Sequence, residues 1–231
     1  MPKTYYTQEE YDMERRIAEA LTTVIDNVDR AIGYSFEDTG NKGHYRLIPF
    51  NSHRFIELME RVKKVWQTYC KIKLPHPNQY ASFLDVGCGI GTKIQLASNL
   101  GFEAKGIENN KNYIKFAKKL CYDNNIIDID GRNYMFYDKY NIIYFYVPNT
   151  KEEFEIEMET KIIKDCREGT ILLPVSGDFA YFIRYKRKAT DIDLLKENHI
   201  HLIDHMIYIK CSDESIVKKL QALFMKDNDK D

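Results

Sequence analysis

Cysteine is scarce and scattered in this 231-residue chain: there are five, and no two of them form a C-x-x-C pair. An odd, dispersed set fits neither a disulfide framework nor a zinc knuckle, so the sequence predicts a reducing compartment and no metal site. Long apolar runs are also missing, and the start, M-P-K-T-Y-Y-T-Q-E-E, lacks the apolar core of a signal peptide. We therefore expect a cytoplasmic protein with no membrane partner.

An excess of charge of one sign is missing as well. Lys and Arg number 34 against 35 Asp and Glu, which leaves a formal net charge of -1. Such a chain has no overall attraction to a nucleic-acid backbone or to an anionic membrane surface, so a nucleic-acid partner is not indicated. The length fits one domain of ordinary size, alone or with a helical extension.

The first part of the chain is predicted to be helical. A capping box of Thr7 and Glu10 begins a run of apolar residues at helical intervals. A second amphipathic helix is expected from about Asn51 until two prolines end it. We interpret residues 1–79 as an N-terminal helical extension or lid that forms one compact unit with a second part, residues 80–231.

Short apolar runs alternate with amphipathic helices in this second part, which is the pattern of an α/β fold with a parallel sheet. Strands are expected at 82–86, 103–108, 126–130, 141–147 and 170–175. Helices are expected near 92–100, 110–123 and 151–167. Farther on, the pattern indicates a long strand or hairpin arm at 200–210 and a closing helix at 215–225.

Three glycines stand at alternate positions in F-L-D-V-G-C-G-I-G-T-K, residues 83–93. Glycine is unfavourable in ordinary helices and strands, so this cluster indicates a backbone that turns sharply or approaches a ligand. Ligands of open parallel sheets bind outside the carboxyl ends of the strands, which is where this motif lies. Its spacing differs from the dinucleotide fingerprint G-x-G-x-x-G, because Thr92 occupies the place of the last glycine.

The chain resembles the class I S-adenosylmethionine-dependent methyltransferases over residues 80–175. The resemblance rests on V-G-C-G-I-G behind an apolar strand, on Glu108 at the end of the second strand and on Asp130 near the end of the third. It implies a doubly wound α/β fold, in which a mostly parallel seven-stranded sheet is flanked by helices, and S-adenosyl-L-methionine as the cofactor. The implied activity is methyl transfer to an acceptor whose class the sequence does not identify.

The resemblance also implies roles for individual residues. The loop glycines would let the backbone approach the methionine part of the cofactor, and Asp85 would lie near its ammonium group. Glu108 would accept hydrogen bonds from both ribose hydroxyls, and Asp130, or alternatively Asp128, would accept one from the adenine amino group. The implied cofactor-binding residues are Asp85, Gly87, Cys88, Gly89, Gly91, Glu108, Asn109, Asp130 and Gly131.

Two of these residues also have simpler interpretations. Cys88 can be a small packing residue, since nothing in the sequence indicates a lowered thiol pKa. Asp130 can cap a turn that begins at Gly131, because aspartate side chains often accept hydrogen bonds from the backbone just after them. The sequence alone leaves both pairs of interpretations open.

The residues after the fourth strand, Y-F-Y-V-P-N, are those that lie near the transferred methyl group in the family. They depart from the [D/N/S]-P-P-[Y/F] signature of enzymes that methylate amino groups of DNA bases or of glutamine, which puts those acceptors in doubt. Tyr146 and Asn149 are the candidates for orienting an acceptor, although the tyrosine can be a packing residue and Asn149 can begin the next helix.

Two other functions are compatible with the same fold. One is a non-catalytic, cofactor-binding partner or regulatory subunit, which the missing fourth-strand signature would fit. The other is aminopropyl transfer from a decarboxylated cofactor.

Overall fold

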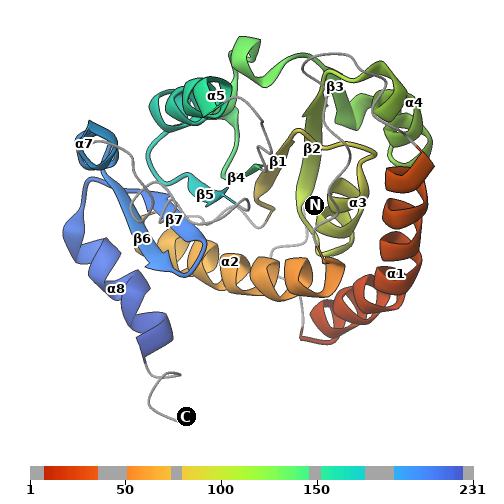
Figure 1. Ribbon diagram of the computed structural model, residues 1–231. Helices are drawn as coiled ribbons and strands as arrows, with labels where there is room; N and C mark the ends of the chain where they lie inside the picture. Colours follow the sequence, from red (N-terminus) through yellow and green to blue (C-terminus); the bar gives the residue numbers. More distant parts are fainter. Residues whose placement is uncertain (1–7, 36–50, 74–79, 146–151, 175–189, 226–231) are drawn as a thin grey trace.

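A seven-stranded sheet forms the centre of the protein (Figure 1). The computed structural model describes residues 8–35, 51–73, 80–145, 152–174 and 190–225. The strands are β1 (Ser82–Val86), β2 (Glu103–Glu108), β3 (Ile126–Asp128), β4 (Ile142–Phe145), β5 (Ile171–Pro174), β6 (Ile200–Asp204) and β7 (Ile207–Lys210). Their order across the sheet is β3-β2-β1-β4-β5-β7-β6. The first five run parallel, whereas β7 pairs antiparallel with β5 and β6, so the sheet is mixed and mostly parallel, as expected.

Helices surround this sheet (Figure 1). The α-helices are α1 (Gln8–Ser35), α2 (Ser52–Lys73), α3 (Thr92–Asn99), α4 (Lys111–Leu120), α5 (Glu152–Asp165), α7 (Thr190–Glu197) and α8 (Glu214–Met225). Three short 3-10 turns are η1 (Asp123–Asn125), η2 (Gly131–Asn133) and η3 (Tyr137–Lys139). Within the described ranges, no helix combines the length and the apolar character that a membrane crossing needs.

The two faces of the sheet bury different apolar clusters, because side chains alternate along each strand. Phe83 and Tyr144 belong to the cluster that includes side chains of α2, α3 and α8. Leu84 and Phe145, their neighbours along the strands, belong to the cluster that includes side chains of α5. Helices therefore cover both faces, which is the flanked-sheet architecture that the resemblance implied.

Helix α2 packs into the first of these clusters. The Phe55 side chain is fully buried, and its ring lies edge-on to Phe83 and Tyr144, with centroid separations of 6.2 and 5.3 Å. Burial of one such side chain stabilises a fold by ~1.5–3 kcal/mol. α2 also contacts α1, α3 and α8. The interpretation of residues 1–79 as a lid stays a prediction.

The positions of β1 and β2 match the predicted ranges residue for residue, and β4 and β5 lie inside theirs. β3 ends at Asp128 and not at 130, because Asp130 leaves the strand to cap η2. The region 200–210 forms a hairpin of two strands, β6 and β7. Helix α7 has no counterpart among the elements predicted from the sequence.

The chain reverses direction across the sheet between β1 and β4, which are neighbours. β2 and β3 extend the sheet on one side of β1, and β4 and β5 then extend it on the other side. Ligands of open α/β sheets bind at such a switch point, outside the carboxyl ends of the strands. The predicted cofactor-binding residues all lie at the ends of β1, β2 and β3 or directly after them.

Candidate functional site

The loop between β1 and α3 is built on left-handed backbone. Gly87, Gly89 and Gly91 have φ angles of 77°, 54° and 84°, a region that side-chain-bearing residues rarely adopt. The amides of Gly87 and Cys88 donate to the Ile107 carbonyl at 2.9 and 3.0 Å, and the Gly91 amide donates to the Cys88 carbonyl at 2.9 Å. The three glycines therefore let the chain fold back on itself directly at the end of β1.

Glu108, the last residue of β2, holds this loop in place. Its side chain is buried, and its Oε2 accepts a hydrogen bond from the Gly89 amide at 2.9 Å. Its Oε1 accepts from the amides of Asn109 and Asn110 at 2.9 and 2.8 Å. Hydrogen bonds to a charged acceptor are roughly twice as strong as neutral ones. One carboxylate thus joins the glycine loop to the segment that begins α4.

Asp85 lies next to the loop on β1 and is almost fully buried, at 3% exposure. In register it lies between Gly106 of β2 and Tyr144 of β4. Burial, followed by the charges of Asp85 and Glu108, raises the pKa of the Cys88 thiol well above its ordinary value. Cys88 is therefore a neutral thiol at physiological pH, and the structure favours its interpretation as a packing residue over one as a nucleophile.

Asp130 caps the turn η2, as the simpler interpretation of this residue expected. Its Oδ1 accepts hydrogen bonds from the backbone amide and the Nε of Arg132, at 2.9 and 3.0 Å. Its Oδ2 accepts from Arg132 Nη2 at 2.7 Å and from Asn109 Nδ2 at 3.5 Å. The hydrogen bond from the Arg132 side chain is the main reason that the pKa of Asp130 lies below its ordinary value, so this carboxylate is charged at neutral pH.

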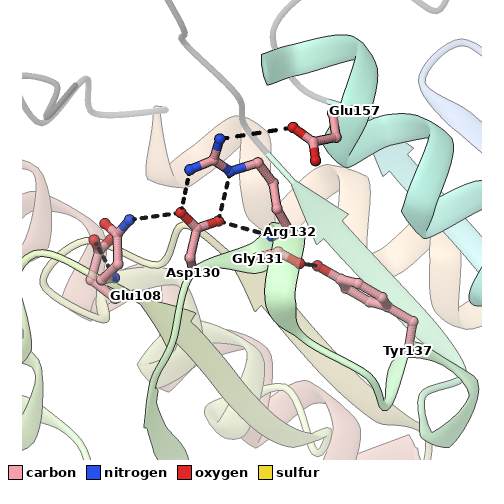
Figure 2. Close-up of polar contacts among 7 residues, drawn as sticks. Glu108, Asp130, Gly131, Arg132, Tyr137 and Glu157 are labelled. Atoms are coloured by element: carbon pink, nitrogen blue, oxygen red, sulfur yellow. Dashed lines mark hydrogen bonds and ion pairs between the residues drawn. The ribbon is translucent and has the colours of Figure 1, made fainter. Parts of the chain in front are cut away.

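Arg132 is a residue of this site that sequence reasoning missed. Figure 2 shows its guanidinium between Asp130 and Glu157 of α5, and the Arg132 Nη1 to Glu157 Oε2 distance is 3.8 Å. Gly131 lies beneath, and the buried Tyr137 hydroxyl donates to its carbonyl at 2.8 Å (Figure 2). An arginine two residues after the acid was the available signal, and it is a weak one, because such spacing is common on surfaces.

Lys93 is the last residue of the glycine-rich stretch 83–93, and the sequence predicted no role for it. It lies in the first turn of α3, only 6% exposed, and its ammonium donates to the buried Ser52 hydroxyl of α2 at 3.1 Å. The Ser52 amide in turn donates to Asp26 of α1 at 3.2 Å. These contacts connect the two N-terminal helices to the helix that follows the glycine loop.

The acceptor side of the site lies mostly outside the described residues. That is where Tyr146 and Asn149 fall, so their predicted role in orienting an acceptor stays a prediction. Tyr144 of β4, two residues before Tyr146, is buried and packs edge-on to Phe55. In the part of the chain that the structure describes, no three His, Cys, Asp or Glu side chains gather as a metal site would require.

No protein-family model matches the chain, and neither does any curated protein. Among solved structures, it is similar to the plantazolicin methyltransferase BpumL in complex with a pentazolic desmethylPZN analogue and SAH, with a TM-score of 0.42 and 17% identity over 82% of this chain and 69% of that one. It is also similar to magnesium protoporphyrin IX methyltransferase ChlM from Synechocystis PCC 6803 with bound SAM, with a TM-score of 0.42 and 16% identity over 81% and 86% of the two chains.

A third solved structure is the glycopeptide N-methyltransferase MtfA complexed with SAM, with a TM-score of 0.37 and 12% identity over 48% of this chain and 53% of that one.

Proposed function

We propose that this chain is a class I S-adenosylmethionine-dependent methyltransferase that transfers a methyl group to an acceptor of unidentified class. The observation that carries the proposal is the 2.9 Å contact between the Gly89 amide and Glu108. It joins a left-handed glycine loop at the end of β1 to a buried carboxylate at the end of β2, on a seven-stranded sheet at its switch point. The motif and its acid thus act as one unit, which an ordinary strand-to-helix turn does not need.

The residues at this place suit the cofactor chemically. The ribose has two neighbouring hydroxyl donors, and Glu108 is a buried, charged acceptor at the end of the adjacent strand. Three backbone amides already donate to this carboxylate, so the ribose would share its oxygens with them. When bound, S-adenosylmethionine supplies a methyl group on a cationic sulfonium centre. Asp85 and Glu108 both lie close enough to Cys88 to raise its thiol pKa, so two carboxylates flank the loop, and negative charge favours a cation at short range.

The contribution of the chain to the reaction is then mainly positioning. A loop fixed by Glu108 and by the Ile107 carbonyl holds its backbone still, and a fixed backbone lets a bound group keep one orientation toward its reaction partner. Tyr146 and Asn149 are the proposed residues on the acceptor side. A general base is needed only for an acceptor that arrives protonated, so no residue is assigned that role.

Calorimetric titration of the wild-type protein and of Glu108→Ala tests the proposal directly. The ligands are S-adenosylmethionine, S-adenosylhomocysteine and NAD. We expect the wild type to bind both adenosyl compounds and not NAD. Glu108→Ala should weaken this binding by about 1–3 kcal/mol, because the ribose loses a charged acceptor and the glycine loop loses the carboxylate that fixes it.

Glu103→Ala is the matched control, since Glu103 lies at the other end of β2 and is exposed. Its affinity should equal that of the wild type. Glu108→Ala also removes the partner of three backbone amides, so Glu108→Gln, which keeps the shape and one acceptor oxygen, is titrated if the alanine variant does not fold. Absence of adenosyl binding by the wild type, or binding of NAD alone, would refute the methyltransferase proposal.

A further inference from the structure

The acceptor capacity of Asp130 is filled from within the protein. A carboxylate offers about four lone-pair positions. Arg132 contributes three donors, namely its backbone amide, Nε and Nη2 at 2.9, 3.0 and 2.7 Å, and Asn109 Nδ2 contributes the fourth at 3.5 Å. An adenine amino group would have to displace one of these donors. Two of them belong to a bidentate pair between charged groups, the strongest arrangement that such hydrogen bonds adopt.

Arg132 is held on two sides by this arrangement. Asp130 engages the Nε and Nη2 edge of the guanidinium, and Glu157 of α5 lies 3.8 Å from Nη1 (Figure 2). The Arg132 side chain is nevertheless 32% exposed, against 23% for Asp130. Figure 2 shows Glu108 on one side of Asp130 and Arg132 next to it, so the guanidinium lies at the same end of the sheet as the predicted ribose acceptor.

We propose that Arg132 is the residue that contacts the nucleobase of the cofactor, by stacking its guanidinium plane on the base, and that Asp130 is a positioning residue that orients Arg132. The inference rests on the proposed function, since it names how that cofactor is held. Guanidinium groups are planar and stack on aromatic rings, and a rigid fork loses little freedom when it does so. Asn109 supports the same arrangement by joining the end of β2 to Asp130.

The two modes of recognition depend on different parts of the base. A carboxylate that accepts from the exocyclic amino group discriminates strongly against a base that carries a carbonyl there. Stacking uses the ring face that every base has, so it tolerates such a change. The ratio of affinities for S-adenosylhomocysteine and S-inosylhomocysteine therefore reports which residue recognises the base.

The experiment is calorimetric titration of both compounds into the wild type, Arg132→Lys, Asp130→Asn and a control, Lys139→Met. For the wild type we expect affinities within about fivefold of each other, whereas an unsatisfied hydrogen bond would separate them by about 5–150-fold. Arg132→Lys keeps the charge but loses the plane, so both ligands should bind about 5–150-fold more weakly, as expected for the loss of one stacked base. Lys139 is exposed and, among the described residues, its ammonium pairs with the neighbouring Asp138, so Lys139→Met tests for an effect of charge alone and should leave both affinities unchanged.

Asp130→Asn distinguishes positioning from direct contact. If Asp130 orients Arg132, both ligands weaken and their ratio stays near the wild-type ratio. A wild-type ratio far above fivefold that falls to near one in Asp130→Asn would overturn the inference and assign the base to Asp130. Unchanged affinities in Arg132→Lys would also overturn the inference. If Asp130→Asn does not fold, the affinities of Arg132→Lys alone test whether Arg132 contacts the base. If the wild type does not bind S-adenosylhomocysteine at all, the proposed function fails together with the inference. If the wild type binds it and one of the outcomes above contradicts the role of Arg132, the inference alone fails.

Discussion

Gly106, in the middle of β2, sets how closely the glycine loop can approach the sheet. A Cβ atom built at this position would lie 2.6 Å from the Cβ of Cys88 and 2.7 Å from its Sγ, and it would overlap the Cδ1 of Ile94. Real Cβ atoms do not come so near to other atoms. The absence of a side chain at Gly106 therefore lets the loop and the first turn of α3 pack directly on β2.

Gly106→Ala should destabilise the protein by about 1–3 kcal/mol, because an added methyl group overpacks a full core. Ile94→Val removes the Cδ1 atom in the way and should by itself cost about 0.5–1.5 kcal/mol. The double variant should be more stable than the sum of the two changes predicts, by at least ~0.5 kcal/mol, because the pair is in contact. Urea denaturation of the four proteins measures these free energies, and strict additivity would contradict the account.

The sharp turn at the loop glycines was predictable from the sequence, whereas the hydrogen-bond partners of Glu108 and Asp130 were not. The roles of the loop glycines as turn formers follow from local chemistry, because only glycine adopts left-handed backbone freely. The paired hydrogen bonds from Arg132 to Asp130 could not be predicted from the sequence, because a nearby arginine can point in many directions. Gly106 was not singled out either, since its importance depends on Cys88 and Ile94, which reach it only in three dimensions.

Among the elements, α5 is fixed at its carboxyl end by a residue of β7. The ammonium of Lys210 donates to the carbonyls of Ile163 and Cys166 at 2.8 and 2.9 Å, and to that of Lys164 at 3.3 Å. The last carbonyls of a helix have no partner within the helix and carry partial negative charge. One side chain therefore caps α5 and connects it to the antiparallel part of the sheet.

Lys210→Met should lower the free energy of unfolding by about 1–2 kcal/mol, because the helix end loses a charged donor. Methionine keeps a similar length, so packing changes little. Lys164→Met is the control on the same helix end: its side chain is exposed, and the expected change is within ~0.5 kcal/mol. Chemical denaturation of both variants provides the comparison, and equal losses would mean that the cap contributes nothing beyond a general charge effect.

The limits of strands were predictable where turn-forming residues flank them. Gly87 follows β1, and β2 lies between Gly101 and Asn109; the predicted and observed limits of both strands coincide. The hairpin of β6 and β7 could not be divided from the sequence, because its turn contains no glycine. His205 takes the positive φ, at 24°, that glycine would normally supply, so the usual signal was missing.

At the scale of the whole molecule, all five cysteines are buried and unpaired in a disulfide. Burial is the main reason that the pKa of the Cys70, Cys121 and Cys166 thiols is raised to about 11. Burial also raises the pKa of the Cys88 and Cys211 thiols. A thiol with a pKa of about 11 is ionised in about one molecule in a thousand at pH 8. The thiols are thus protected both by lack of access and by protonation.

We expect Ellman's reagent at pH 8 to label none of the five thiols in the folded protein within the time in which it labels all five in guanidinium chloride. The thiols should then become reactive together, at the denaturant concentration at which circular dichroism reports unfolding. Rapid labelling of one thiol in a protein whose circular dichroism is unchanged would show that this part of the core opens on its own. The reducing, cytoplasmic location expected from the sequence stays a prediction.

Helix α2 is synthesised well before α8, yet α8 completes the cover of its apolar side. Phe224 of α8 is buried against it, and Arg61 and Lys64 of α2 each lie 5.3 Å from the centre of that ring. β1 to β3 and their helices are contiguous in the chain and can assemble while the ribosome is still translating. The apolar side of α2 is fully covered only after α8 has been synthesised, so the nascent chain exposes that side until then.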